Sequence, residues 1–222
     1  MKILILGATG AAGGSLLDVA RRDRRVAEIR TISRQPIEGA ATRETGYLHS
    51  DLFDYTAIAA AFRGLDAAFF CVGRSVTQVG DEVEYRKLAW QAPQVAARAL
   101  ADGSPAAVLH YLSGQGASRT SPQMWARVKA EAEMILMERH GAVCWRPGAI
   151  DATRTAGWPF FYRGVIRAMR YVFPSRRYYV RGEDLALAIL EVASENVRGR
   201  IYENPEIRAL ADHARKRPEP NP

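Results

Sequence analysis

Short apolar runs alternate with amphipathic stretches along most of this chain. The runs have the length of strands, and the stretches between them repeat apolar residues at the spacing of helices. The pattern predicts strands at 3–6, 28–33, 46–48, 66–72, 106–112 and 142–145. It predicts helices at 11–22, 55–63, 82–102, 122–140, 160–171 and 183–194, the third of them kinked or divided by Pro93 because proline interrupts a helix.

This alternation indicates one fold class. Strands joined by helices form a mostly parallel sheet with helices on both faces and right-handed crossovers. The predicted strand at 66–72 is apolar after its first residue, as in strands buried on both faces. We predict an α/β fold, a doubly wound Rossmann sheet flanked by helices. A single domain would cover 1–212, with a small C-terminal cap at about 149–182, and the basic, proline-rich tail at 213–222 would be disordered.

A glycine-rich loop joins the first predicted strand to the first predicted helix. Residues 7–13 read Gly-Ala-Thr-Gly-Ala-Ala-Gly. Glycine allows a backbone to approach a ligand closely, and the N–H groups and positive dipole end of the helix suit a pyrophosphate. The alternative is an ordinary turn between a strand and a helix. We predict a dinucleotide-binding loop formed by Gly7, Thr9, Gly10, Ala11, Ala12 and Gly13.

The end of the second predicted strand bears on the choice of cofactor. It reads Ser33-Arg34-Gln35-Pro36, without an acidic residue. In a doubly wound fold an acid at this place binds the ribose of NAD, whereas an arginine accommodates the 2′-phosphate of NADP. The planar guanidinium of Arg34 matches a phosphate. We therefore predict NADP rather than NAD, held by Ser33 and Arg34; the alternative is that Arg34 is a solvated surface residue.

Composition and charge limit the classes of partner. The chain has 31 Lys and Arg against 24 Asp and Glu, a formal charge of +7 that suits an anionic ligand. No basic helix with interleaved aromatic residues supports a nucleic-acid partner. The two cysteines, Cys71 and Cys144, lie in apolar runs, and no Cys/His spacing indicates a metal site.

Nothing in the hydropathy pattern indicates export or a membrane anchor. We find no signal peptide and no apolar stretch of the ~20 residues that a membrane-spanning helix needs. We therefore expect a cytoplasmic protein that acts on a small molecule, with a homo-oligomer or a protein partner left open.

The glycine loop and four later motifs together resemble the atypical short-chain dehydrogenase/reductase proteins, in particular their NAD(P)H-binding NmrA-like and Tat-interacting oxidoreductase-like group. The order and spacing of the motifs agree with the family over roughly 1–205. The later motifs are Asp51-Leu52, Gly64-Leu65-Asp66 followed by Phe69-Phe70-Cys71-Val72-Gly73, Leu112-Ser113-Gly114 and Arg146-Pro147-Gly148.

The resemblance implies a Rossmann core that binds a nicotinamide cofactor. It places Asp51 and Leu52 near the adenine. It also implies a Ser with Tyr-x-x-x-Lys in catalytic members: tyrosine transfers the proton, lysine holds the nicotinamide ribose, and serine binds the substrate oxygen. Ser113 and Lys129 match the last two roles. The residues placed along the nicotinamide side of the cofactor are Cys71, Val72, Gly73, Pro147 and Gly148.

One residue departs from the family pattern. Trp125 stands four positions before Lys129, where the family has tyrosine. Its indole N–H donates a hydrogen bond but does not transfer a proton near neutral pH. Trp125 either lines the site or continues the apolar helical stripe of Val128, Ala132 and Ile135 into the core.

Two functions therefore remain open. The first is an NADP-dependent oxidoreductase of a small carbonyl or quinone-like compound. A quinone or flavin needs no acid from the protein, whereas a carbonyl would take its proton from water or from one of Tyr85, His110, Tyr111 and Tyr162. The second is a non-catalytic NADP(H)-binding redox sensor or regulatory scaffold. The residues are also compatible with an epimerase or dehydratase that keeps its cofactor bound.

An aromatic stretch at 157–179 is the predicted substrate cover. Ligands of doubly wound folds lie beyond the carboxyl ends of the strands, where the loops at 113–118 and 148–157 emerge. The aromatic residues that follow would line an apolar pocket there. The alternatives are that they pack the last helices onto the sheet or form a partner interface.

Overall fold

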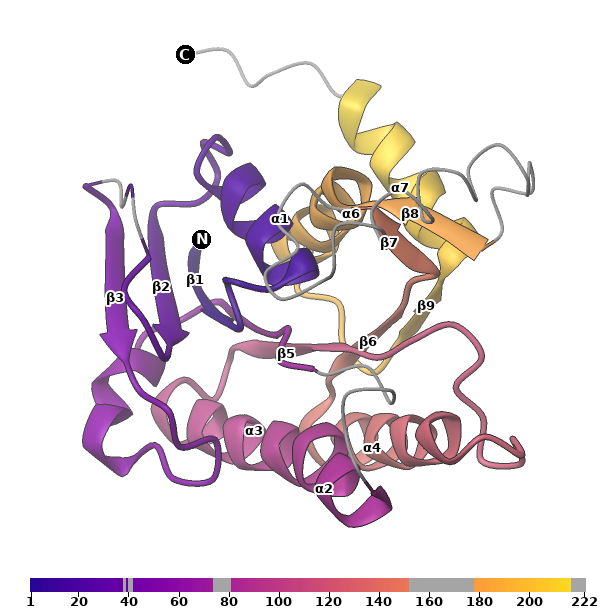
Figure 1. Ribbon diagram of the computed structural model, residues 1–222. Coiled ribbons are helices and arrows are strands. Elements are labelled where there is room, and N and C mark those ends of the chain that lie inside the picture. Colours follow the sequence, from indigo (N-terminus) through magenta and orange to yellow (C-terminus); the bar gives the residue numbers. More distant parts are fainter. Residues whose placement is uncertain (38, 40–41, 74–80, 152–177, 217–222) are drawn as a thin grey trace.

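Seven parallel strands form one sheet in the order β3-β2-β1-β4-β5-β6-β9 (Figure 1). The structure is a computed structural model, and it describes residues 1–37, 39, 42–73, 81–151 and 178–216. The strands are β1 (Lys2–Leu6), β2 (Glu28–Ser33), β3 (Glu44–Leu48), β4 (Ala67–Phe70), β5 (Val108–Leu112), β6 (Val143–Arg146) and β9 (Ile201–Glu203). A second, two-stranded parallel sheet pairs β7 (Ala149–Asp151) with β8 (Tyr179–Arg181).

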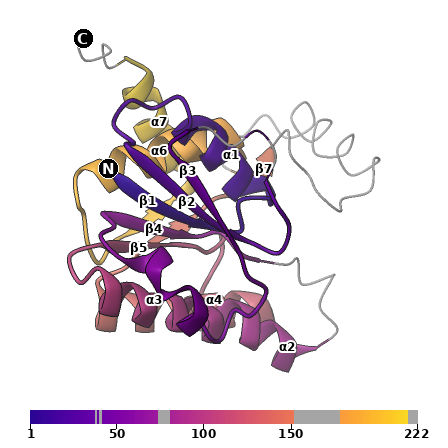
Figure 2. The same cartoon turned by 90° about the vertical axis from the view of Figure 1, so that its left-hand side faces the viewer.

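Helices cover both faces of the large sheet (Figures 1 and 2). One face carries α1 (Ala11–Ala20), α6 (Gly182–Ser194) and α7 (Asn204–Lys216). The other face carries η1 (Thr56–Phe62), α3 (Ala92–Gly103) and α4 (Met124–His140). Alternate side chains of β1 therefore enter two separate cores, Ile3 and Ile5 on the α1 side and Leu4 and Leu6 on the α3 side.

The Rossmann fold class predicted from the sequence is confirmed, and several elements differ in detail. The helix expected at 55–63 is the 3₁₀ helix η1, and the helix expected at 11–22 ends at Ala20. The small sheet of β7 and β8, strand β9 and helix α7 were not anticipated. Helix α7 continues to Lys216, so 213–216 are helical rather than disordered as predicted. The helix expected at 160–171 and the tail at 217–222 lie outside the described residues.

Pro93 divides the long helix as predicted, by way of a π-helical turn. The chain runs from α2 (Glu82–Arg86) through the π-helical segment η3 (Lys87–Gln91) into α3. Pro93 has no N–H to offer the carbonyl of Ala89, four residues earlier. The hydroxyl of Tyr111, on strand β5, donates a hydrogen bond of 2.6 Å to that carbonyl instead. Tyr111 is fully buried, so its polar group is committed to holding this helix against the sheet.

We expect the Tyr111→Phe substitution to destabilise the protein by about 1–3 kcal/mol, because it leaves the buried Ala89 carbonyl without its partner. Urea denaturation followed by circular dichroism measures the change. Tyr178→Phe is the matched control, since Tyr178 is more than half exposed, and its effect should stay within about 0.5 kcal/mol. Equal stability of the two variants would contradict the role given to Tyr111.

Candidate cofactor site

The site forms where the strand order reverses. From β1 the chain proceeds outward to β2 and β3 on one side, and later to β4, β5 and β6 on the other. Leu6, the last residue of β1, is paired with Ile32 of β2 and with Phe70 of β4. The residues that follow these strands therefore emerge side by side at the carboxyl edge of the sheet, which is where ligands of open α/β sheets bind.

The loop after β1 packs closely against the end of β4 and the start of α1 at two glycines. Gly7 has a φ of +85°, and a Cβ there would lie 2.9 Å from the carbonyl carbon of Cys71 and the nitrogen of Val72. A Cβ on Gly13 would lie 2.3 Å from the carbonyl oxygen of Gly7. Any side chain at these positions would force α1 or β4 away from the loop. The predicted roles of Gly7 and Gly13 therefore have a steric basis in the fold.

Gly10 differs from these two glycines because the described residues leave room for a side chain there. A Cβ on Gly10 would meet no atom of the described chain nearer than the Gly7 oxygen, at 3.4 Å. Gly10 is the N-cap of α1 and gives its N–H groups no side-chain partner, and the first helical turn contains no acidic residue. The N–H groups at Ala11 and Ala12 thus remain available to an anion, with Thr9 exposed beside them. This cradle fits a pyrophosphate.

Ser33 and Arg34 come next to the loop at the end of β2. The Ser33 hydroxyl donates to the carbonyl of Gln35 at 2.6 Å, so it does not offer its proton to a phosphate in this conformation. Arg34 is exposed, and its side chain has no ion pair or hydrogen bond with the described residues. Arg34 is therefore the group of this pair that is free to donate to a phosphate.

The loop after β3 brings Asp51 and Leu52 to the same edge. The exposed Asp51 carboxylate accepts a hydrogen bond from the Phe53 N–H at 2.7 Å, which fixes the turn. Leu52 is half-buried against the core on the α3 side. Their contact with adenine stays a prediction.

The end of β4 contributes a backbone wall. The N–H of Cys71 donates to the carbonyl of Leu6 at 2.9 Å, which extends the sheet pairing past Phe70. Burial raises the pKa of the Cys71 thiol to about 12, so the group stays protonated and is no nucleophile. Val72 is half-buried and Gly73 is exposed, in positions that can border a ligand.

The loops after β5 and β6 are joined to each other. The N–H of Ser113 donates to the carbonyl of Trp145 at 2.8 Å, and that of Gln115 donates to the carbonyl of Pro147 at 3.0 Å. The Ser113 hydroxyl oxygen is buried and has no hydrogen-bond partner among the described residues. Such a group is uncommon in a folded protein and calls for a ligand or water to complete it.

Trp125 lies against the loop that carries Ser113. A Cβ added at Gly114 would lie 3.5 Å from the indole ring, and one added at Gly116 would lie 3.9 Å from it. It is half-buried and also packs on the small cluster of Tyr85 and Val128. Trp125 therefore packs on a core cluster, as one alternative predicted, and its ring also approaches the loop that carries Ser113; its role as part of a cofactor site stays a prediction.

Lys129 points from α4 toward the carboxyl end of β5. Its ammonium donates to the carbonyl of Leu112 at 2.8 Å and lies 4.6 Å from the centroid of the Tyr111 ring. Burial lowers the pKa of Lys129 to about 8, although the charge of Glu133 opposes the shift. An ammonium has three donors, and the hydrogen bond to Leu112 uses one of them.

Gly148 is fixed by an approach that no other residue allows. A Cβ on Gly148 would lie 2.5 Å from the carbonyl carbon and oxygen of Tyr178. The Gly148 N–H donates to the fully buried side chain of Asn204 at 2.9 Å, and the Asn204 amide donates to the carbonyl of Tyr179 at 3.2 Å. Asn204 was not identified from the sequence. It ties Gly148 and the buried Pro147 to the C-terminal part of the fold.

The structure argues against three of the four protein acids considered from the sequence. His110 is buried, its Nδ1 accepts from the Trp145 indole at 3.2 Å, and burial lowers its pKa to about 3. Tyr111 is committed to Ala89. Burial raises the pKa of Tyr85 to about 12. The fourth acid, Tyr162, and most of the predicted cover at 157–179 lie outside the described residues.

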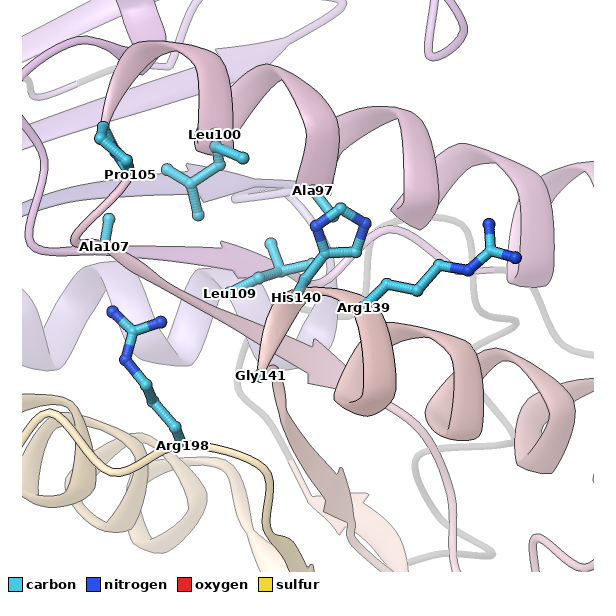
Figure 3. Close-up of a pocket in the computed structure, with 10 residues that line it drawn as sticks. Ala97, Leu100, Pro105, Ala107, Leu109, Arg139, His140, Gly141 and Arg198 are labelled. Atoms are coloured by element: carbon cyan, nitrogen blue, oxygen red, sulfur yellow. The ribbon is translucent and has the colours of Figure 1, made fainter.

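A cavity of about 290 Å³ lies at the opposite, amino-terminal end of β5 and β6 (Figure 3). Arg139 belongs to the last turn of α4, where positive charge complements the helix dipole, whereas burial and the neighbouring arginines lower the pKa of His140 and favour its neutral form. Figure 3 shows the Arg139 guanidinium pointing away from the apolar floor. Arg198 donates to the carbonyl of Ala106 at 2.6 Å. Helix ends and carbonyls therefore account for these cations without a ligand.

Two features are absent from the part of the chain that the structure describes. No helix there combines the length and the apolar character that a bilayer crossing requires. No group of three or more His, Cys, Asp or Glu side chains there is arranged to hold a metal ion.

Comparisons with known proteins show a familiar fold. No family model matches the chain. It is 24% identical over 205 residues, 88% of each chain, to Protein FMP52, mitochondrial, of Debaryomyces hansenii. The fold resembles that of a short chain dehydrogenase family protein from Francisella tularensis, with a TM-score of 0.67 at 12% identity over 91% of this chain and 96% of that one.

A second solved structure contains bound ligands. It is a dTDP-glucose 4,6-dehydratase from Streptomyces venezuelae with NAD and TYD bound, matched with a TM-score of 0.68 at 16% identity over 95% of this chain and 80% of that one. At these identities the likeness concerns the fold. The chain therefore shares the Rossmann fold of these two structures, and the motif resemblance predicted that fold.

Proposed function

We propose that this protein is an NADP(H)-dependent oxidoreductase of the atypical short-chain dehydrogenase/reductase type, acting on a small carbonyl or quinone-like compound. One observation carries the proposal: the glycine cradle at the point where the strand order reverses shares the sheet edge with Lys129 and with the buried hydroxyl of Ser113, which has no partner among the described residues. The dehydratase of the same fold, which has NAD bound, supports a nicotinamide cofactor.

Each residue of the edge would have one task. The N–H groups that begin α1 would hold the pyrophosphate, with Gly10 leaving room for it. Lys129 would donate to the nicotinamide ribose, since its hydrogen bond to Leu112 leaves two donors. Ser113 would donate to the substrate oxygen, and Trp125 would cover its loop against water. A bound nicotinamide would supply or accept the hydride.

The preference for NADP rests on Arg34. Its guanidinium is exposed, is free of partners in the described chain, and follows the strand whose end reaches the adenosine ribose in doubly wound folds. No acid stands beside it to repel a 2′-phosphate, because the segment reads Ser33-Arg34-Gln35-Pro36. This favours NADP over NAD.

A second candidate function follows from Trp125. The family's proton-transferring tyrosine is absent, His110 and Tyr111 are engaged in hydrogen bonds with Trp145 and Ala89, and burial raises the pKa of Tyr85 to about 12, which makes it a weaker acid. This favours either an acceptor that needs no protein acid, such as a quinone, or an NADP(H)-binding sensor without turnover. A sensor must bind its partner differently with NADPH and with NADP⁺, so equal partner affinity in both states would contradict it.

The experiment is NADPH oxidation measured against a panel of carbonyls and quinones. We expect wild-type turnover with quinones and little with carbonyls. A positioned general acid contributes about 10²–10⁴ in rate, and we expect the Trp125→Tyr variant to gain at least about tenfold with carbonyls. Trp125→Phe is the control, since it removes the indole without adding an acid. Inactivity of all three proteins with every acceptor would leave the sensor function.

The cellular location remains a prediction. The sequence favours the cytoplasm, whereas the name of the Debaryomyces hansenii relative places that protein in mitochondria. Fractionation of cells that express the full chain distinguishes the two compartments.

A further inference from the structure

A buried ion pair at the end of β6 lies one helical turn along α4 from Lys129. Glu133 lies one helical turn after Lys129 on α4 and is almost fully buried. Arg146 donates to both of its carboxylate oxygens, at 2.9 Å from Nε and 2.6 Å from Nη2. The remaining Nη1 of Arg146 donates to Glu203 of β9 at 2.8 Å.

Stabilisation of the fold does not by itself explain the ion pair of Glu133 and Arg146. A buried ion pair is weak evidence for stability, because desolvation offsets much of the Coulomb attraction and an apolar pair often serves as well. What an apolar pair does not supply is charge at a defined place. Here Glu133 stands four residues after Lys129 on the same face of α4, where its charge acts on the Lys129 ammonium, and Arg146 is followed directly by Pro147 and Gly148.

We propose that Glu133 and Arg146 are positioning residues for the cofactor, Glu133 by keeping Lys129 charged and Arg146 by holding the turn at Pro147 and Gly148 and by moderating the charge of Glu133. The inference rests on the proposed function, because it assigns Lys129 to the cofactor ribose. It adds two residues that act through others and that do not touch the cofactor themselves.

The groups around Lys129 determine whether a substitution raises or lowers its pKa. Burial lowers its pKa to about 8, and Glu133, Cys144 and Cys71 oppose the shift, in that order. The Tyr111 ring faces the same ammonium. Both thiols have raised pKa values, chiefly through burial, and stay neutral, so Glu133 is the anion in this set. Its removal should lower the pKa of Lys129 further.

Arg146 has the opposite effect to Glu133 on the pKa of Lys129. It partly neutralises Glu133 through two charge-assisted hydrogen bonds. Without Arg146, the full charge of Glu133 would act on Lys129 and raise its pKa. The two substitutions should therefore move one titration in opposite directions, whereas damage to a shared structural contact would move it in one direction or not at all.

The test is the Kd of NADP⁺ measured by calorimetry between pH 6.5 and 9.5. We expect wild-type affinity to fall about tenfold as Lys129 loses its proton, with a midpoint near pH 8. Glu133→Gln should lower this midpoint by about one pH unit, and Arg146→Met should raise it similarly. The Lys129→Met variant records the pH dependence of the cofactor itself.

Glu203→Gln is the matched control. It also removes a carboxylate partner of Arg146, but Glu203 is not among the charges that act on Lys129, so its midpoint should stay that of the wild type. Each charge-altering variant tests the inference on its own if the other does not fold. Unmoved midpoints, or shifts of both variants in one direction, would overturn this inference alone. Absence of NADP⁺ binding by the wild type would overturn the proposed function with it.

Discussion

Replacing Gly13 by alanine is expected to weaken binding of NADP(H) strongly and to destabilise the fold. The new Cβ would lie 2.3 Å from the Gly7 carbonyl oxygen, which is backbone held by β1 and cannot turn aside. Overpacking of this kind costs about 1–3 kcal/mol and here forces α1 away from the loop. Loss of the phosphate contacts should weaken binding by at least about 100-fold, equivalent to ~2.7 kcal/mol. Thermal unfolding and cofactor titration measure the two effects.

The Gly10→Ala substitution tests cofactor binding separately from the stability of the fold. Its Cβ would meet the described chain only at 3.4 Å, so the free energy of unfolding should change by less than about 1 kcal/mol. The methyl group would instead occupy the space kept for the pyrophosphate and should weaken NADP(H) binding by about tenfold or more, ~1.4 kcal/mol. Wild-type affinity of this variant would contradict the placement of the phosphate at α1.

The second large effect concerns the choice between cofactors. Arg34→Ala should weaken NADPH binding by about 10–100-fold, because a hydrogen bond to a charged group contributes about 1.5–3 kcal/mol, and should leave NADH binding unchanged. Parallel titrations of both cofactors measure the ratio. Arg24→Ala is the control, since Arg24 is also exposed but follows α1 at the far end of the sheet. An equal loss for both cofactors would show that Arg34 acts elsewhere than on the 2′-phosphate.

The parts of the fold that were predicted depend on local sequence. The glycine loop identifies its own conformation, since Gly7 needs a positive φ and Gly13 needs the absence of a Cβ. The order of strands and helices follows from hydrophobic periodicity, which is also a local property of the sequence. Strand β9 has only three residues, and its place beside β6 comes from the tertiary fold, so no local pattern marked it.

The missed site residues depend on contacts between distant parts of the chain. Arg146 meets Glu133 across 13 residues and Glu203 across 57, and Gly148 meets Asn204 across 56. Sequence reasoning found Arg146 and Gly148 as parts of a motif but had no means to pair them. A signal was present only for Glu133, which lies one helical turn after Lys129.

The candidate acids His110 and Tyr111 show that closeness to the site in sequence does not place a side chain in the site. His110 and Tyr111 are neighbours in β5, so their side chains enter opposite cores. His110 stacks on Trp145 and accepts from its indole, while Tyr111 bonds to Ala89 beneath the helices of the other face. Both are titratable residues close to the site in sequence, and only the packing shows that neither is free to act in it.

One measurement tests the central claim most directly: calorimetric titration of the full chain with NADPH and, in parallel, with NADH. We predict binding of NADPH at one site per chain and markedly weaker binding of NADH, from the cradle of Gly7, Gly10 and Gly13 together with Arg34. Absence of binding by either nucleotide would contradict the account and would mean that this Rossmann shell binds something other than a nicotinamide cofactor.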